Sequence, residues 1–269
     1  AKYVLDYWDR PEYLYLGPDE NMHDSVIQWI AEQSKKYEYM PGGSFISSKP
    51  GAGINHKEYG VTSLGVNVYM HETLKYIGIN PFKDTFSVKM SGGPDGDVAG
   101  NQILNLFKYY PHTAKLLALI DVSGTIHDPH GLDLSIMAEL CRAGKSSRYY
   151  PPEKLHEGGF ILDRFTKRSP TQLVQQTLCW RKKGGKVVED WVSGSEMHQL
   201  LRENVHQTKT DVFIPSGGRP RTLNESNIKE YLDETGKPTS KIIIEGANLY
   251  LTPPARRILE DAGVLIIKD

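Results

Sequence analysis

The sequence predicts a doubly wound α/β fold, in which helices cover both faces of a parallel sheet. From residue 85 onward, short runs of β-branched and apolar residues alternate with segments of helical periodicity. The turn between the first of these strands and its helix is rich in glycine. The chain has 269 residues, of which 39% are hydrophobic and 24% charged, so it can bury a core in one or two domains.

Residues 1–84 are predicted to form a mainly helical segment that leads into the sheet domain. A stretch rich in Tyr, Trp and Pro comes first, and Asp19 then opens a helical pattern whose apolar face holds Met22, Val26, Ile27 and Ile30. Proline and glycine mark residues 41–53 as a loop. A second helix is predicted from about Tyr59 to Ile77, because Gly78 suits the end of a helix.

Residues 85–269 are predicted to form the sheet domain. Its expected strands are Thr85–Met90, Lys115–Asp121, Asp211–Ile214, Lys241–Glu245 and Val264–Ile267. Four helices are expected between these strands. The first ends at Pro111, the second ends near Gly144, and the other two span Asn224–Leu232 and Pro253–Ala262. Region 145–205 interrupts this order as a small β-rich insert, and the residues around Lys182–Lys186 predict a hairpin within it.

The composition argues against several classes of partner. The formal net charge is −1, whereas nucleic-acid-binding proteins usually carry a basic face or stripe. No apolar run approaches the ~18–20 residues that span a bilayer, and no N-terminal export signal is visible. We therefore expect a cytoplasmic protein without a nucleic-acid or membrane partner.

The two cysteines, Cys141 and Cys179, lie far apart and lack the spacing of metal ligands. Cys141 falls on the apolar stripe of a predicted helix, and Cys179 falls in a β-like run beside Trp180. We expect both to be inert core thiols in a reducing compartment, and we expect no metal site.

The main functional signal is the glycine-rich turn that opens the sheet domain. It joins the first predicted strand to the first predicted helix and carries glycine at positions 92, 96 and 100. Glycine lets the backbone come close to a pyrophosphate, and the N–H groups at a helix N-terminus stabilise phosphate charge. The turn therefore predicts a dinucleotide site in which the pyrophosphate is cradled by Gly92, Gly96, Asp97 and Val98.

Close packing is an alternative explanation of this turn. Its spacing differs from G-x-G-x-x-G, and Asp97 puts an anionic side chain near the phosphates. The glycines would then only let the helix approach the strand. Asp121 favours the cofactor, because it ends the next strand, 25 residues after Gly96, where a carboxylate accepts hydrogen bonds from the adenosine ribose and disfavours a 2′-phosphate. The predicted cofactor is therefore NAD.

Further segments place polar or small residues where a ligand binds in other α/β proteins. Asp19 and Thr62 stand at predicted helix starts, and Ser216, Gly217 and Asn248 follow predicted strands. Ligands of open α/β sheets bind beyond the carboxyl ends of the strands. Each of these residues also has a simpler explanation as a helix cap or turn residue, and taken singly the simpler explanation is favoured.

Together and in this order, the segments resemble the glutamate/leucine/phenylalanine/valine dehydrogenase family. Leu16–Asp19 is similar to the family segment that carries the catalytic aspartate, and Lys49–Pro50 is similar to its lysine–proline loop. Gly60–Val66 is similar to the start of a family helix, and Gly246–Pro253 is similar to the family's Gly-Ala-Asn signature. The segment after the family's second strand is similar to Asp121–Gly124 with Asp128–Asp133. The large NAD-specific glutamate dehydrogenases of the family are most similar at Gly96–Asn101 and Pro215–Pro220. The likeness covers roughly residues 14–269 and is weakest in the insert.

The resemblance implies a Rossmann-like domain that binds NAD. The implied reaction is the oxidation of L-glutamate to 2-oxoglutarate and ammonia, by a full-length enzyme expected to be a homo-oligomer. Asp19 would be the catalytic base. Thr62 and Asn248 would lie near the nicotinamide, and Ser216 and Gly217 would line the cleft.

The chain departs from the family in three places. No segment with the family's substrate-binding lysines precedes Asp19, and Ser63 and Leu64 stand where smaller members have Gly and Arg. The chain also stops at Asp269, before the segment that completes the family's substrate pocket. We therefore expect this chain alone to bind cofactor without turnover. Two other classes stay open, a domain that binds NAD as a regulatory ligand and a scaffold with an empty cleft.

Overall fold

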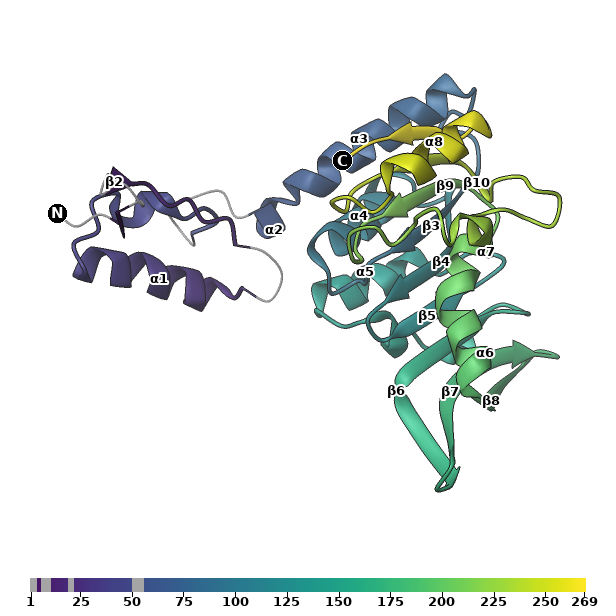
Figure 1. The fold of residues 1–269 in the computed structure, drawn as a ribbon. Helices are drawn as coiled ribbons and strands as arrows, with labels where there is room; N and C mark the ends of the chain where they lie inside the picture. Colours follow the sequence, from purple (N-terminus) through teal and green to yellow (C-terminus); the bar gives the residue numbers. More distant parts are fainter. Residues whose placement is uncertain (1–3, 6–10, 19–21, 50–55) are drawn as a thin grey trace. The chain divides into compact units, whose positions relative to one another are not determined.

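The computed structural model describes residues 4–5, 11–18, 22–49 and 56–269. The chain divides into two compact units (Figure 1), the N-terminal unit (residues 1–61) and the sheet unit (residues 62–269). Helix α3 (Val61–Tyr76) contributes buried side chains to the core of the sheet unit. The boundary expected between residues 84 and 85 would place α3 outside the sheet unit, although its side chains belong to the core of that unit.

The N-terminal unit is built around helix α1 (Asp24–Lys36). This helix packs Ile27 and Ala31 against two buried residues at and after the 3₁₀ helix η1 (Gly42–Phe45), Phe45 and Ile46. The two-residue strands β1 (Val4–Leu5) and β2 (Pro11–Glu12) pair antiparallel, and helix α2 (His56–Tyr59) ends the unit.

The predicted apolar face of the first helix is wrong in part. Met22 and Val26 are 37% and 38% exposed. Because the helix begins at Asp24, Met22 lies before its first turn, and the buried face instead holds Ile27, Ala31 and Ser34. The predicted start at Asp19 lies outside the described residues.

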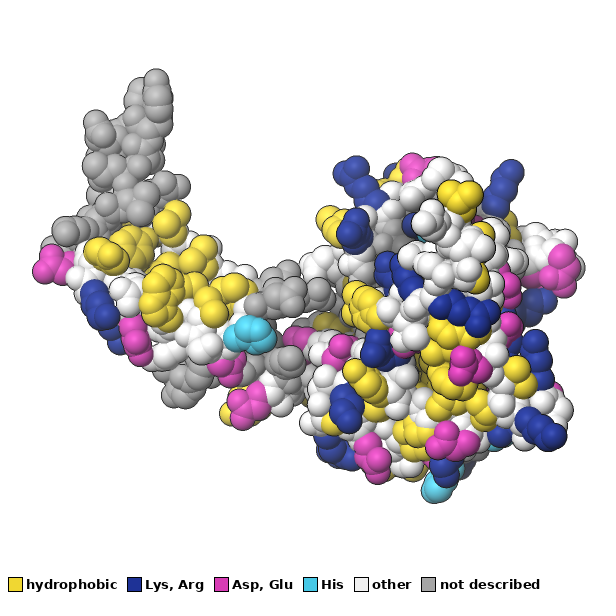
Figure 2. Space-filling view, turned by 90° about the horizontal axis from the view of Figure 1, so that it is seen from below, with side chains coloured by type: hydrophobic (Ala, Val, Ile, Leu, Met, Phe, Trp, Pro, Cys, Tyr) yellow, Lys and Arg dark blue, Asp and Glu magenta, His cyan; other side chains and the backbone are white. Residues whose placement is uncertain are grey.

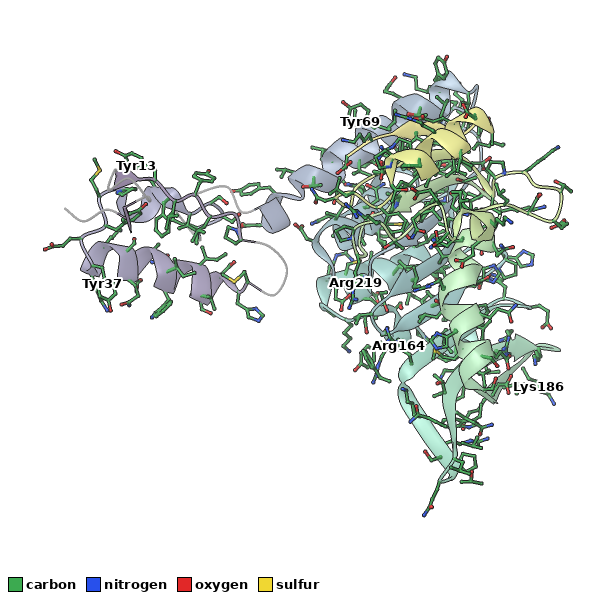
Figure 3. All side chains as sticks on the ribbon, in the orientation of Figure 1. Tyr13, Tyr37, Tyr69, Arg164, Lys186 and Arg219 are labelled. Carbon is green, nitrogen blue, oxygen red and sulfur yellow. The ribbon has the colours of Figure 1, made fainter. Side chains whose placement is uncertain are left out.

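Large apolar side chains remain exposed on the N-terminal unit. Figure 2 shows hydrophobic side chains gathered on one of its faces, and Figure 3 shows Tyr13 and Tyr37 pointing outward. Other strongly exposed aromatic side chains here are Tyr15 and Trp29. Only a small apolar cluster is buried within the described part of this unit.

The sheet unit contains one sheet of nine described strands, in the order β11-β10-β9-β3-β4-β5-β6-β7-β8. Its parallel half consists of β3 (Phe86–Ser91), β4 (Ala114–Asp121), β9 (Thr210–Pro215), β10 (Ser240–Ile244) and β11 (Leu265–Ile267). Its antiparallel half consists of β5 (Gly124–His127), β6 (Phe160–Thr171), β7 (Val174–Lys183) and β8 (Lys186–Val192). The predicted α/β class and all five predicted strands are confirmed.

Helices cover both faces of the parallel half, as predicted (Figure 1). Helices α3, α4 (Asp97–Tyr109) and α5 (Leu134–Arg142) belong to one core cluster, and α7 (Asn204–Gln207) and α8 (Pro253–Asp261) belong to the other. Helix α6 (Gly194–His198) and the π-helical segment Gln199–Glu203 pack on the antiparallel half. No helix in the described ranges has both the length and the apolarity to cross a membrane.

The sheet is mixed, whereas a parallel sheet was predicted. After β4 the chain reverses through Val122 and Ser123 and returns at once as β5. Gly124 permits this reversal, since its φ is +154° and a Cβ there would lie 1.7 Å from the carbonyl oxygen of Leu162 on β6. The strand after Asp121 was missed because it is only four residues long.

Two predicted helices differ in the structure. The helix expected over Asn224–Leu232 is only a 3₁₀ turn, η5 (Ile228–Tyr231), because the Asn224 and Asn227 side chains bond nearby backbone groups and compete with helical bonds. The long helix expected from Tyr59 is broken at Gly60, whose φ is +57°. The stop at Gly78 is confirmed.

The predicted hairpin is confirmed. Strands β7 and β8 are joined by Gly184 and Gly185, whose φ values of +59° and +74° suit a two-residue hairpin loop. The insert therefore extends the sheet as antiparallel strands.

Lys89 is a fully buried lysine at the centre of β3. Its Nζ donates to the carbonyls of His206 and Thr208 at 3.0 and 2.9 Å and to Thr239 Oγ1 at 2.7 Å. Nζ also lies 4.3 Å from the centroid of the Tyr231 ring. Burial holds the pKa of Lys89 well below its ordinary value. One side chain thus ties β3 to the end of α7, to the residue that follows it and to the segment before β10.

We predict that Lys89→Met lowers the free energy of unfolding by about 2 kcal/mol, because two buried carbonyls lose their donor. Lys115→Met on the neighbouring strand is the control, since Lys115 is exposed, and its effect should stay within about 0.5 kcal/mol. Urea denaturation measures both. Equal stabilities of the two variants would contradict the bonding assigned to Lys89.

Candidate functional site

The carboxyl ends of three parallel strands meet at one edge of the sheet. The amide of Ser216, after β9, donates to the carbonyl of Ser91 at the end of β3 at 2.9 Å. The amide of Gly246, after β10, donates to the Pro215 carbonyl at 2.9 Å. Each strand end is thus fixed to the next by a backbone hydrogen bond.

Two glycines face each other across this edge. Gly92 has a φ of +98°, and a Cβ there would lie 2.8 Å from Ala99 Cβ and 3.1 Å from the Gly217 nitrogen. A Cβ on Gly217 would in turn lie 2.9 Å from the Gly92 Cα. Real Cβ atoms do not approach a backbone so closely, so both positions require glycine.

The three glycines of the predicted turn have different roles. Gly100 allows the turn to pack on α4, because a Cβ there would lie 2.4 Å from the Pro94 carbonyl oxygen. Gly92 likewise serves packing. Gly96 does not need its conformational freedom, since its φ of −80° is open to any residue. The packing explanation therefore accounts for the glycines at positions 92 and 100, but it does not explain why position 96 is a glycine.

Gly96 is the N-cap of α4, where it provides no side chain to bond the first-turn amides. These N–H groups, with the partial positive charge of the helix end, are suited to a phosphate. The carboxylate of Asp97, the first helical residue, accepts from Asn101 Nδ2 at 3.2 Å, so it is held along the helix. Val98 points to the edge, where its Cγ1 would lie 3.0 Å from a Cβ on Gly246.

The carboxylate of Asp121 closes the turn after β4. Oδ1 accepts from the amide and hydroxyl of Ser123 at 2.7 and 2.6 Å and from the Gly124 amide at 3.2 Å. Oδ2 accepts from the Ser147 amide at 2.8 Å, and a Cβ on Gly93 would lie 2.8 Å from this oxygen. The carboxylate is therefore held beside the glycine-rich turn, and Oδ2 has capacity for a second donor.

The other candidate residues differ in how closely they join the edge. Ser216 is buried and Gly217 contacts Gly92, whereas Thr62 and Asn248 are exposed. Thr62 stands in the first turn of α3, and its neighbour Ser63 donates through Oγ to the Val98 carbonyl at 2.8 Å. Asp19 lies outside the described residues.

Sequence reasoning missed two residues that shape this edge. Ser91 Oγ donates to the Gly217 carbonyl at 2.5 Å. The ring of Tyr250 packs against the loop, since a Cβ on Gly218 would be 2.9 Å from its Cε2. A serine at the end of an apolar strand was the available signal for Ser91. Tyr250 gave no signal, because its partner Gly218 is distant in sequence.

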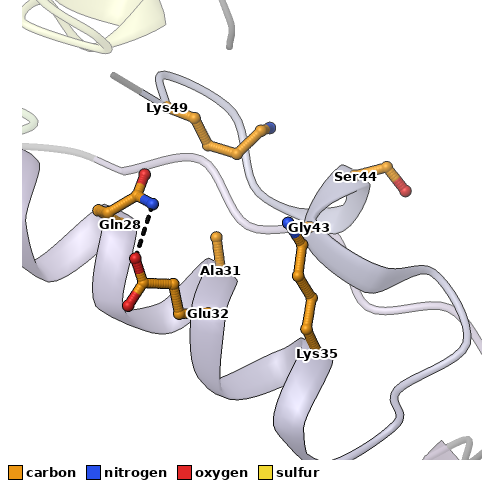
Figure 4. Close-up of a pocket in the computed structure, with 7 residues that line it drawn as sticks. All are labelled: Gln28, Ala31, Glu32, Lys35, Gly43, Ser44 and Lys49. Atoms are coloured by element: carbon orange, nitrogen blue, oxygen red, sulfur yellow. Dashed lines mark hydrogen bonds between the residues drawn. The ribbon is translucent and has the colours of Figure 1, made fainter. Parts of the chain in front are cut away.

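The N-terminal unit has a separate pocket (Figure 4), lined by Gln28, Ala31, Glu32, Lys35, Gly43, Ser44 and Lys49. Gln28 Nε2 donates to Glu32 Oε1 at 2.9 Å across its wall. Lys49 Nζ donates to the Ile46 carbonyl, and this bond holds the Lys49 side chain against its own loop. These contacts are internal to the unit and provide no catalytic arrangement.

Both cysteines are unreactive thiols, as expected. Burial raises the pKa of Cys141 and of Cys179 to about 12. Among the residues that the structure describes, no group of three or more His, Cys, Asp or Glu side chains is arranged to hold a metal ion.

Comparisons with known proteins agree with one another. The Glutamate/Leucine/Phenylalanine/Valine dehydrogenase family model matches residues 52–167 and 168–269. The probable NAD-specific glutamate dehydrogenase of Schizosaccharomyces pombe is 33% identical over 99% of this chain and 22% of that protein. The NAD-specific glutamate dehydrogenase of Saccharomyces cerevisiae is 32% identical over 97% of this chain, again 22% of its own length. This chain thus spans about a fifth of the length of these relatives.

A solved structure shows the same fold. The hetero-hexameric glutamate dehydrogenase from Thermus thermophilus superposes with a TM-score of 0.58 over 95% of this chain and 46% of that chain. The sequence identity is 17%, so this likeness concerns the fold alone.

We predict that Gly100→Ala lowers the free energy of unfolding by about 2–3 kcal/mol, because the new Cβ must displace the Pro94 carbonyl. Gly65→Ala is the matched control, since Gly65 also lies inside a helix but has open space around its Cβ position. It should stabilise the protein by about 0.5–1 kcal/mol. Thermal unfolding measures both variants, and a neutral Gly100→Ala would contradict the close approach.

Proposed function

The chain belongs to the Glutamate/Leucine/Phenylalanine/Valine dehydrogenase family, and we propose that it is the NAD-binding part of an enzyme that oxidatively deaminates L-glutamate. The observation that carries the proposal is the open N-terminus of α4 beside the ends of β3, β9 and β10. The names of the fungal relatives support NAD and glutamate as cofactor and substrate. The products would be 2-oxoglutarate and ammonia.

In this proposal the pyrophosphate binds at the glycine-rich turn. Gly92, Gly96, Asp97 and Val98 would offer backbone groups, and the end of α4 adds partial positive charge. A side chain at position 96 would stand between these amides and the ligand. The Asp97 carboxylate weakens the local field, which is partly offset by its bond to Asn101.

Asp121 would bind the adenosine ribose through the open capacity of Oδ2. Its three bonds at Oδ1 and one at Oδ2 fix the carboxylate in advance, so binding costs little ordering of this side chain. A 2′-phosphate would place two anions side by side, and this repulsion favours NAD over NADP.

Bound NAD would supply the hydride acceptor, and the chain's own residues would hold it. Ser216 and Gly217 would line the cleft at the end of β9, and Thr62 and Asn248 are assigned to its nicotinamide end by their family motifs. Asp19 is assigned as the base that moves protons during imine formation and hydrolysis.

Gly96→Val tests the pyrophosphate site. The φ of −80° at position 96 is open to any residue, and a Cβ there would lie 3.2 Å from the Gly93 carbonyl oxygen, which must shift by a few tenths of an ångström. The far-ultraviolet circular dichroism should therefore stay nearly unchanged. Calorimetric titration should show NAD affinity reduced by at least about tenfold, or about 1.4 kcal/mol. Gly194→Val at the start of α6 is the control, because its Cβ position is open. Unfolding of Gly96→Val would favour the packing explanation, and unchanged affinity would exclude this site.

Cofactor choice tests Asp121. We predict that the wild-type chain binds NAD at least about tenfold more tightly than NADP, or about 1.4 kcal/mol. Asp121→Asn should narrow this ratio, because the amide carries no charge and its oxygen can keep the bonds of Oδ1. The same titration measures both nucleotides. Equal wild-type affinities would contradict the assignment of Asp121 to the ribose.

A further inference from the structure

The insert brings two exposed aromatic rings together at the surface of the sheet unit. Tyr149 ends the 3₁₀ helix η2 (Ser147–Tyr149), and Phe165 lies on β6. The exposed fractions of these two residues are 53% and 56%. The guanidinium of Arg148 lies close to both rings, since its Cζ is 4.9 Å from the centroid of the Tyr149 ring and 5.6 Å from that of the Phe165 ring. We call the side chains of Arg148, Tyr149 and Phe165 the aromatic platform.

The platform is bonded to the turn that holds Asp121. The amide of Ser147 donates to Asp121 Oδ2 at 2.8 Å, and the amide of Arg148 donates to Ser123 Oγ at 3.4 Å. On β6, the amide of Arg164, which Figure 3 labels, donates to the Ser123 carbonyl at 2.9 Å. Both segments that carry the platform are thus fixed to the turn after β4, so the platform lies next to the carboxylate of Asp121.

A buried carboxylate holds the platform in shape. Asp163 Oδ1 accepts from Arg148 Nη1 at 3.3 Å and from the amide of Phe165 at 3.0 Å, and Asp163 is buried. Because these bonds fix the guanidinium before any ligand arrives, binding costs little ordering of this side chain. The ion pair also compensates the charge of Arg148, so this cation does not remove the repulsion between Asp121 and a 2′-phosphate.

A planar nucleobase is the ligand chemistry that fits the platform. Aromatic rings and guanidinium planes bind bases by stacking. In the proposed cofactor site, the adenosine ribose would bond Asp121 Oδ2, the oxygen that also accepts from the Ser147 amide. The base is joined to that ribose by one bond, so it reaches the residues that follow Ser147. Val122, which follows Asp121 and is 64% exposed, adds apolar surface beside the ribose.

We propose that the insert provides the base-binding surface of the cofactor site, and that the aromatic platform selects a purine base. This inference rests on the proposed function, in which Asp121 binds the adenosine ribose. None of the three platform residues lies in a family motif, because the likeness is weakest in the insert. A purine presents a larger flat area than a pyrimidine, so it stacks more strongly on the same rings. The base, in addition to the ribose, thus determines which dinucleotide binds.

Tyr149→Ala tests the stacking, with Tyr76→Ala at the end of α3 as the matched control, since the Tyr76 ring is also exposed. Calorimetric titration compares NAD with nicotinamide cytosine dinucleotide, which carries a pyrimidine in place of adenine. The wild type should bind NAD about fivefold more tightly than the cytosine analogue. Tyr149→Ala should weaken NAD binding by about tenfold, or 1.4 kcal/mol, and should reduce the preference for adenine to less than about twofold. Tyr76→Ala should change neither value.

Arg148→Lys tests the guanidinium, with Arg168→Lys as the matched control. Arg168 also lies over a ring, since its Cζ is 4.5 Å from the centroid of Trp191 on β8, and its Nε donates to Gln176 on β7. A lysine at position 148 can keep the ion pair with Asp163, but its ammonium has no plane on which a base can stack. Arg148→Lys should weaken NAD binding by roughly fivefold, and Arg168→Lys should leave it unchanged. Unchanged NAD affinity in Arg148→Lys would overturn the role of the guanidinium.

The two proposals fail in different ways. If the wild type binds no NAD, the proposed function fails, and this inference fails with it. If the wild type binds NAD without a preference for adenine, or if Tyr149→Ala keeps the affinity and the preference of the wild type, only the inference is overturned. An equal loss of affinity for both dinucleotides in Tyr149→Ala would also overturn it, because damage to the turn would explain that result without a base contact.

Discussion

The backbone contact between Gly92 and Gly217 is the constraint on which the rest of the sheet edge depends. A Cβ on either residue would enter the other's backbone, so β3 and β9 can end side by side only because both positions are glycine. This contact fixes where the turn leaves β3, and hence where α4 begins. The open amides of α4, the position of Val98 and the loop at Ser216 all follow from it.

At Asp121 and at Lys89, one ionisable side chain holds several segments of the chain together. Asp121 binds the backbone of the β4–β5 turn and of the segment at Ser147, and it still faces the glycine-rich turn. Lys89 joins β3 to the end of α7 and to the segment before β10. Both groups are anchored before any ligand arrives, which limits the ordering that binding would require.

Much of the fold could be predicted because its signals are local. Alternating strands and helices, the Gly184–Gly185 loop and the stop at Gly78 depend on neighbouring residues. The predictions failed where contacts between residues distant in sequence determine the local structure. The return of β4 as β5 depends on how Gly124 meets Leu162 on β6, and the apolar face of α1 depends on Phe45.

The candidate site divides in the same way. Gly92, Gly96, Val98 and Asp121 could be selected from one turn and the following strand, and the structure brings them together. The sequence could not distinguish the role of Gly96 from the roles of Gly92 and Gly100, because the atoms that a Cβ would meet come together only in the folded chain. Ser91 and Gly217 lie 126 positions apart and meet only in the folded chain.

The central claim is that this sheet edge binds NAD, and its most direct test is an amide chemical-shift titration of the isotopically labelled chain with NAD. The largest changes should fall on the amides of Gly93, Gly96, Asp97, Val98 and Gly217, with smaller changes near Asp121. The pocket of the N-terminal unit provides an internal comparison, and its amides at Lys35, Gly43 and Ser44 should not respond. Changes confined to that pocket, or no saturable change at the end of α4, would contradict the account.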